Sequence, residues 1–200
     1  MDRAKSKTLG RRDFLASAAA AAAVTVVRPS AVRGSQANSA LALGAIGCGG
    51  RGTWIAELFQ KHGKYRYVAC ADYFQDRADA FGKKYEIPAA ARFTTLSAYK
   101  RLLEQKLDAV VIETPPYFHP EHAAAAVDAG KHVFTAKPIA IDVPGCLTIG
   151  ESGQKAREKK LVFLVDFQTR ANAAFRETAR RVHAGQIGRI VCASAPHRRR

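Results

Sequence analysis

A glycine-rich turn follows the first apolar run of the chain. Gly47, Gly49 and Gly52 form the pattern G-x-G-x-x-G, with Gly50 and Arg51 ahead of the last glycine. Glycines at this spacing permit a tight turn, let the backbone approach a diphosphate, and let a following helix pack closely on the preceding strand. The N–H groups at the start of that helix would hold the negative charge of a dinucleotide. A plain glycine turn is the alternative.

Asp72 ends the next apolar run, 20 residues beyond the last glycine. A carboxylate at this place accepts hydrogen bonds from the hydroxyls of an adenosine ribose. It also repels a 2′-phosphate, so Asp72 favours NAD over NADP as the cofactor. A solvated acid at a strand end is the alternative for Asp72. Arg51 and Arg77 could still meet a 2′-phosphate, so NADP stays open.

Short apolar runs alternate with longer amphipathic segments from residue 41 onward, which is typical of βαβ units. The predicted strands span 41–47, 65–71, 109–113, 132–135 and 161–166. The predicted helices span 52–62, 75–85, 96–106, 120–130 and 143–159, with Gly130 closing one and Asp142 preceding another. We therefore expect an α/β fold with a doubly wound parallel sheet of Rossmann type over residues 41–170. Such a sheet binds ligands at the carboxyl ends of its strands.

Two later strand ends carry further polar residues. Thr114 and Pro115 follow one apolar run, and His119 comes soon after them. Lys137 and Pro138 follow the next run, which an Ala-Gly-Lys-His-Val stretch opens. With the Ala-rich helix between them, these segments resemble the Gfo/Idh/MocA family, which includes glucose-fructose oxidoreductase and inositol dehydrogenase. The resemblance runs from about residue 41 to residue 194.

The resemblance implies roles for these residues. Lys137, in the Lys-Pro pair with Pro138, matches the family lysine that reaches the nicotinamide and the reacting hydroxyl. There an ammonium can polarise the substrate oxygen and help to manage its proton. Thr114 and Pro115 match the loop beneath the nicotinamide half of the cofactor. His119 matches a helix-start histidine, with either a cofactor contact or a structural cap as its role. A surface lysine is the alternative for Lys137.

Two residues depart from the family pattern. Ala136 stands where the family has the glutamate of its Glu-Lys-Pro motif, so a carboxylate expected near the nicotinamide ribose is absent. Asp166 replaces a family glycine in the segment 166–172 and could restore negative charge nearby. In that segment Arg170 could sit near the substrate or pin the last strand. Weaker cofactor binding or altered chemistry is the expected consequence of Ala136.

Residues 171–200 resemble the start of a second domain. Family members continue with an α/β domain whose sheet binds substrate, forms the subunit interface and supplies an Asp and a His for catalysis. We expect a helix at 173–183 and then one apolar strand, Arg189 to Ser194, as the first strand of a domain that is otherwise missing. Such a strand would be an unpaired apolar edge. An oligomer is expected only with the complete second domain.

The formal net charge of +15 raises the question of a nucleic-acid partner. Residues 1–40 contribute +5 and the terminal Arg198, Arg199 and Arg200 contribute +3, which leaves a scattered +7. No basic stripe interleaved with aromatic residues is present, so we expect no nucleic-acid binding. The four cysteines lack C-x-x-C spacing, so neither a metal site nor a disulfide framework is predicted. Cys70 and Cys192 are expected to be buried in strands.

Residues 1–40 are predicted to be a leader. Arg11 and Arg12 precede Phe14 and Leu15, and an apolar Ala-rich run extends to residue 27. This resembles a twin-arginine export signal, which implies an extracytoplasmic or periplasmic location. An Ala-rich membrane helix or a misassigned start is the alternative. The apolar run is shorter than the ~20 residues of a membrane-spanning helix, so no stable span is expected.

The leading hypothesis is an NAD- or NADP-dependent oxidoreductase that acts on a sugar or cyclitol hydroxyl. The chain as printed would bind the cofactor without efficient turnover. A nucleotide-binding module without catalysis is one alternative. A methyltransferase dependent on S-adenosylmethionine is a second, because it also uses a glycine-rich loop and an acid at a strand end. The Thr-Pro and Lys-Pro segments argue against that second alternative.

Overall fold

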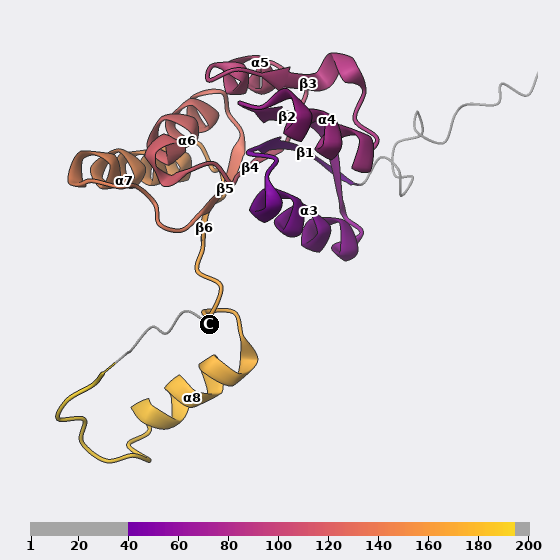
Figure 1. The fold of residues 1–200 in the computed structure, drawn as a ribbon. Coiled ribbons are helices and arrows are strands. Elements are labelled where there is room, and N and C mark those ends of the chain that lie inside the picture. Colours follow the sequence, from indigo (N-terminus) through magenta and orange to yellow (C-terminus); the bar gives the residue numbers. More distant parts are fainter. Residues whose placement is uncertain (1–39, 195–200) are drawn as a thin grey trace, which may run out of the picture. The chain divides into compact units, whose positions relative to one another are not determined.

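The computed structural model of the protein describes residues 40–194, which contain a six-stranded parallel sheet. Its strands are β1 (Leu41–Ile46), β2 (Tyr65–Asp72), β3 (Arg92–Thr94), β4 (Ala109–Ile112), β5 (His132–Ala136) and β6 (Phe163–Asp166). The strand order is β3-β2-β1-β4-β5-β6, which is that of a Rossmann fold (Figure 1). The order reverses beside β1, and the crevice at such a reversal is where this fold binds its ligand.

Five helices connect successive strands: α3 (Gly50–His62), α4 (Gln75–Lys84), α5 (Ala98–Leu103), α6 (His119–Asp128) and α7 (Val143–Glu158). Short 3₁₀ turns, η2 (Ala89–Ala91) and η3 (Pro116–Phe118), lie in two of these connections, and α8 (Ala173–His183) follows β6. Asp142 caps the start of α7, where its carboxylate accepts a hydrogen bond from the backbone N–H of Gly145 at 2.8 Å. Gly130, with φ of 71°, ends the turn after α6.

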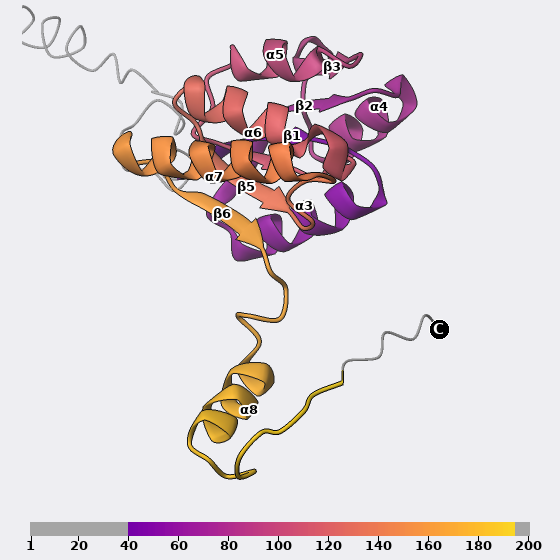
Figure 2. The ribbon, with the colours of Figure 1, turned by 90° about the vertical axis from the view of Figure 1, so that its left-hand side faces the viewer.

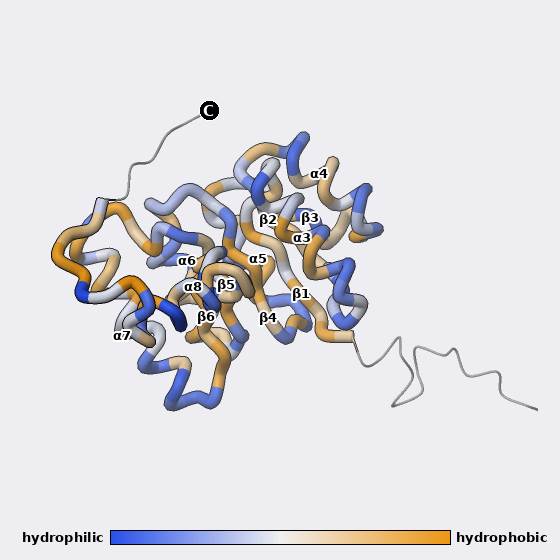
Figure 3. The backbone as a smooth tube through the Cα atoms, turned by 90° about the horizontal axis from the view of Figure 1, so that it is seen from below, coloured by the Kyte–Doolittle hydropathy of each residue, from blue (hydrophilic) through white to orange (hydrophobic). Residues whose placement is uncertain are grey.

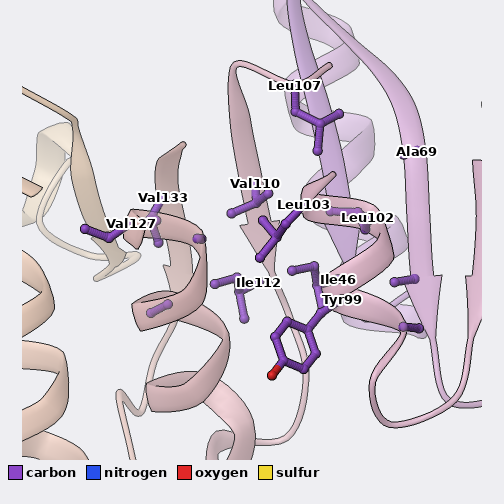
Figure 4. Packing of buried hydrophobic residues seen from close by; sticks show 14 of the residues in the cluster. Ile46, Ala69, Tyr99, Leu102, Leu103, Leu107, Val110, Ile112, Val127 and Val133 are labelled. Atoms are coloured by element: carbon purple, nitrogen blue, oxygen red, sulfur yellow. The ribbon is translucent and has the colours of Figure 1, made fainter. Parts of the chain in front are cut away.

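One face of the sheet is covered by α5, α6 and α7 (Figure 2). Ile46, Val110, Ile112 and Val133 point to this face from β1, β4 and β5. They pack against apolar side chains of the three helices. Figure 4 shows Leu102 of α5 and Val127 of α6 in this packing from close by. Burial of this apolar surface is the main stabilising contribution to the domain.

The opposite face is covered by α3 and α4. Leu43, Tyr67 and Val111 point to this side, where they meet Ile55 of α3 and Phe81 of α4. Neighbouring residues of one strand therefore enter opposite cores, for example Val111 and Ile112. Because β1 and β4 contribute side chains to both cores, these strands are hydrophobic along most of their length (Figure 3).

The predicted doubly wound α/β fold is confirmed, with two corrections. Residues 189–194, within the described part of the chain, form no strand, and Val191 is 88% exposed. An apolar run without a partner strand cannot pair its backbone N–H and C=O groups, so extended structure is not stabilised there. Cys192 is accordingly exposed and not buried, whereas Cys70 is buried as expected.

The predicted leader lies outside the described residues except for Ala40, and so does the terminal segment 195–200. Among residues 40–194, none of the helices has both the length and the apolar character needed to cross a membrane.

Candidate functional site

The predicted site residues follow the carboxyl ends of neighbouring strands. Because all strands are parallel, the segments after β1, β2, β4 and β5 emerge at the same edge of the sheet. The register pairs Ile46 with Ile112 and Ile112 with Thr135. The glycine turn, the Thr114 loop and the Lys137 loop are therefore neighbours at this edge.

Gly47 and Gly52 are required by close packing of the turn. Gly47 has φ of 98°, and a Cβ atom on it would lie 2.7 Å from the backbone carbonyl of Glu113. A Cβ atom on Gly52 would lie 2.0 Å from the carbonyl oxygen of Gly47. Gly52 thus lets α3 pack on β1, as predicted for it, and Gly47 has the positive φ of the predicted tight turn and also lets the end of β4 approach.

Gly49 and Gly50 instead border open space. Within the described chain, a Cβ atom on Gly49 would meet only Nη1 of Arg77 at 3.7 Å, and one on Gly50 would meet nothing within 4 Å. Gly49 is the N-cap of α3 and has no side chain to cap the helix. The backbone N–H groups of the first turn can therefore donate hydrogen bonds to an anionic ligand on this side.

Asp72 uses both carboxylate oxygens to shape the turn. Oδ2 accepts the backbone N–H of Cys48 at 2.7 Å, and Oδ1 accepts the N–H of Phe74 at 3.0 Å. Each oxygen retains a second lone pair for a ligand hydroxyl. Asp72 thus joins the end of β2 to the glycine turn, in addition to the ribose contact predicted for it.

A cavity of about 370 Å³ opens beside these residues. Its walls are Ile46, Gly47, Gly49, Ala71, Asp72, Tyr73, Phe74, Arg77, Thr95, Leu96, Ala98, Tyr99, Glu113, Thr114, Pro115, Phe118 and His122. Most of these side chains are apolar or aromatic, and they suit a flat ring with an attached ribose. The open side of Gly49, the carboxylate of Asp72 and this cavity fit an adenine dinucleotide.

The two arginines predicted near the cofactor lie differently. Arg77 lines the cavity and stacks on Phe74, with its guanidinium carbon 4.6 Å from the ring centre. Arg51 lies over Trp54 at 4.9 Å and is ion-paired with Glu113 and Asp166. Arg77 is therefore the better placed of the two for a ribose phosphate.

Glu113 is a buried acid that the sequence prediction had not assigned to the site. Its side chain is 1% exposed, and Oε2 accepts the Nε–H of Arg51 at 3.2 Å. Burial raises the pKa of Glu113 to about 7; the positive charge of Arg51 opposes this shift and Asp166 adds to it. The position of Glu113 directly after an apolar strand is the sequence signal that could have identified it.

His119 joins the loops that follow β4 and β5. The side chain is fully buried, with Nε2 at 2.7 Å from the carbonyl oxygen of Thr114 and Nδ1 at 2.9 Å from that of Pro138. A neutral ring donates to one of the two carbonyls, and its other nitrogen faces the second. These contacts favour the structural role among the two alternatives for His119.

Lys137 is exposed at the start of the loop after β5, and the cavity walls named above include neither Lys137 nor Pro138. Thr114, in contrast, lines the cavity and lies 3.3 Å from Nδ1 of His122. Burial lowers the pKa of His122 to about 4, so this ring is neutral at pH 7. Sequence reasoning had not identified His122 or the α5 residue Tyr99.

The strand order, the glycine turn and the acid at the end of β2 define a Rossmann domain of the dinucleotide-binding type. Residues 41–167 match the sequence model of the Gfo/Idh/MocA oxidoreductases, described as an oxidoreductase family with an NAD-binding Rossmann fold. The chain belongs to this family.

Individual relatives agree with this assignment. Inositol 2-dehydrogenase 3 of Saccharopolyspora erythraea is 44% identical over 92 residues, which cover 46% of this chain and 27% of that protein. Myo-inositol dehydrogenase Hyg17 of Streptomyces leeuwenhoekii is 26% identical over 150 residues, which cover 75% of this chain and 43% of that protein.

Solved structures share the fold. The scyllo-inositol dehydrogenase of Lactobacillus casei with bound NAD(H) and scyllo-inositol superposes with a TM-score of 0.62 at 24% identity, covering 74% of this chain and 42% of that one. A 3-ketoreductase of Actinomadura kijaniata in complex with NADP superposes with a TM-score of 0.63 at 26% identity. The match covers 76% of this chain and 46% of that one. The chain spans less than half the length of each of these relatives.

Proposed function

We propose that this chain contains the cofactor-binding domain of an NAD- or NADP-dependent oxidoreductase that acts on a hydroxyl of a sugar or cyclitol. One observation carries the proposal: the glycine turn, Asp72 and Lys137 follow the carboxyl ends of three strands of one parallel sheet. A dinucleotide laid across this edge would span from the turn to Lys137. The inositol dehydrogenases among the relatives support the substrate class.

The residues of this chain would bind and orient the cofactor. The N–H groups around Gly49 and Gly50 hold the diphosphate, and Asp72 accepts hydrogen bonds from the adenosine ribose. Thr114 and Pro115 support the nicotinamide half. The bound nicotinamide supplies hydride acceptance and donation.

Lys137 would act on the substrate. Its neutral amine would accept the hydroxyl proton of the substrate as the hydride leaves the carbon, and the ammonium so formed would stabilise the developing carbonyl oxygen. His119 fixes the backbone on both sides of the site through the carbonyls of Thr114 and Pro138, and this limits the movement of the Lys137 loop. Pro138 continues that loop and keeps Lys137 at the strand end.

Both cofactors suit the adenosine side of the site. Asp72 favours NAD because its charge repels a 2′-phosphate. Arg77 could offset that repulsion from the cavity wall. We propose NAD as the preferred cofactor. Calorimetric titration with NAD and NADP measures the preference, and a tighter Kd for NADP would overturn it.

The glycine turn allows a sharp test of dinucleotide binding. Gly50 begins α3 and borders open space, so Gly50→Asp fits sterically and places a favourable negative charge at a helix start. The same charge repels a diphosphate. We expect unchanged or higher stability with at least tenfold weaker binding of NAD, whereas Gly50→Asn retains more of the affinity because it is neutral. Failure of the unaltered chain to bind NAD or NADP at millimolar concentration contradicts the proposal.

A nucleotide-binding module without catalysis is a second candidate. The exposure of Lys137 outside the cavity walls favours it. Reduction of NAD in the presence of inositols, followed by absorbance, separates the two candidates. Turnover that Lys137→Met abolishes supports the oxidoreductase and contradicts the module.

We also propose export by the twin-arginine route. The support is the Arg11-Arg12 pair followed by Phe14, Leu15 and an Ala-rich run. Lysine at both arginine positions is expected to retain the protein in the cytoplasm, as measured by cell fractionation. Equal export of both forms contradicts the route.

A further inference from the structure

Two carboxylates flank Ala136 at the carboxyl edge of the sheet. Ala136 pairs with Asp166 of β6, and Thr135 pairs with Ile112, the residue before Glu113. One row across three strands therefore carries Glu113, Ala136 and Asp166. Arg51 reaches from α3 across this row and is ion-paired with both acids.

The group made of Arg51, Glu113 and Asp166 carries one guanidinium against two carboxylates. With both acids ionised, its net charge is −1. The side chains of Glu113 and Asp166 are 1% and 14% exposed, so water and salt screen this charge poorly. The Oε1 atom of Glu113 is buried and has no hydrogen-bond partner among residues 40–194. Within the described chain, Glu113 is therefore paired through only one of its two oxygens, with Arg51.

Glu113 connects this charged group to the loop that the proposed function assigns to the nicotinamide half. Glu113 directly precedes Thr114, lines the cavity, and faces the glycine turn through its backbone. Ala136 directly precedes Lys137. Resting on the proposed function, this places the group next to the one part of the cofactor whose charge changes in the reaction. The oxidised nicotinamide ring is a cation, and the reduced ring is neutral.

We propose that Glu113 and Asp166 make the site bind the oxidised dinucleotide more tightly than the reduced one. A fixed negative charge attracts the cationic ring and does not act on the neutral ring, whereas all contacts with the diphosphate and adenosine are common to both forms. The site then favours oxidation of a hydroxyl substrate over reduction of a carbonyl. The positive charge of Lys137 opposes this preference equally in all the variants compared below.

Equilibrium titration of the full chain with NAD⁺ and with NADH at pH 8, where Glu113 is ionised, tests the inference without relying on turnover. The measured quantity is the ratio of the two Kd values, NADH over NAD⁺. We expect Glu113→Gln and Asp166→Asn each to lower this ratio about three- to tenfold, mainly through weaker binding of NAD⁺. Asp128→Asn is the matched control, because Asp128 ends α6 near the opposite edge of the sheet, where it pairs with Lys155. The control ratio should equal that of the unaltered chain.

The outcomes separate this inference from the proposed function. If neither dinucleotide binds the unaltered chain, the proposed function fails. If both bind and the ratio stays the same in Glu113→Gln and Asp166→Asn, the inference fails while the proposed function stands. Asp166 is at the sheet edge and partly exposed, so Asp166→Asn decides the question if Glu113→Gln does not fold.

Discussion

Replacing Gly52 with alanine tests the contact that joins the phosphate-binding turn to the sheet. An ideal Cβ atom at this position lies 2.0 Å from the carbonyl oxygen of Gly47 and 3.0 Å from its carbonyl carbon. Ordinary contacts begin near 3.4 Å, so α3 must move away from β1 by about 1.4 Å. The obstructing atoms belong to the backbone, and no change of rotamer can relieve the contact.

The cost follows from what that movement breaks. Ile55 and Ala56 of α3 are packed in the core below the turn and would lose part of their contacts. Overpacking of this kind costs about 1–3 kcal/mol, and the backbone location places Gly52→Ala at the upper end, near 3 kcal/mol. The first turn of α3 would also leave the position in which its N–H groups face the ligand, so we expect at least tenfold weaker binding of dinucleotide.

Urea unfolding, followed by circular dichroism and by the fluorescence of Trp54 on α3, measures the loss of stability. Gly50→Ala is the matched control, because its Cβ atom enters open space two residues earlier in the same helix. We expect this control to be as stable as the unaltered chain or more stable by about 0.5–1 kcal/mol. An unfolding midpoint for Gly52→Ala equal to that of Gly50→Ala would refute the packing argument.

Four further predictions concern single side chains. Asp72→Asn turns one acceptor oxygen into a donor that faces a backbone N–H, so the free energy of unfolding in urea should fall by about 1–2 kcal/mol and NAD binding should weaken; an unchanged free energy of unfolding contradicts this. His119→Ala leaves the carbonyls of Thr114 and Pro138 without their buried partner and should cost about 1–3 kcal/mol in the same assay. Lys137→Met should keep the Kd for NAD within about twofold while abolishing NAD reduction, since its ammonium acts on the substrate; a large loss of binding would assign it to the cofactor. Burial raises the pKa of Glu113 above its unfolded value of 4.5, so its contribution to folding is present below pH 4.5 and is lost as the pH rises through about 7. Glu113→Gln should remove that fall in unfolding free energy.

The same shift gives the preference for oxidised cofactor a pH dependence. The charged or titratable groups around Glu113 are Arg51 from α3, Asp166 from β6 and Tyr67 from β2. Burial raises the pKa of the Tyr67 hydroxyl, so this group stays neutral at pH 7. The Kd ratio of NADH to NAD⁺ should therefore rise between pH 6 and pH 8 as Glu113 ionises. A flat ratio over this range contradicts a direct effect of Glu113.

Local patterns predicted most of the sheet. The runs that became β1, β2, β4, β5 and β6 are apolar and alternate with amphipathic segments, so their positions could be predicted without tertiary information. β3 was not predicted, because its three residues Arg92–Thr94 carry only one buried side chain, Phe93. Its pairing with β2 defines it as a strand, and such pairing is not visible in a short local window.

Some residues of the candidate site were likewise predictable from local patterns, and others were not. The turn glycines and Asp72 are recognisable because the demands on them are local: a φ of 98° at Gly47 and a strand-end carboxylate at a fixed spacing. Arg51 was predicted near the cofactor because the sequence does not show its ion-pair partners. Glu113 and Asp166 lie 62 and 115 residues away along the chain. Only the folded sheet brings these three side chains together.

The sequence by itself determined five of the six strands, the glycine turn and the two strand ends that carry Asp72 and Lys137, because these depend on hydrophobic periodicity and backbone geometry over a few residues. Tertiary structure decided which charges neighbour one another. It placed Glu113 and Asp166 on either side of Ala136, buried His119 between two loops, and separated Arg77 from Arg51. The physical reason is that parallel pairing sets the register between distant segments, and that register fixes which side chains share one edge.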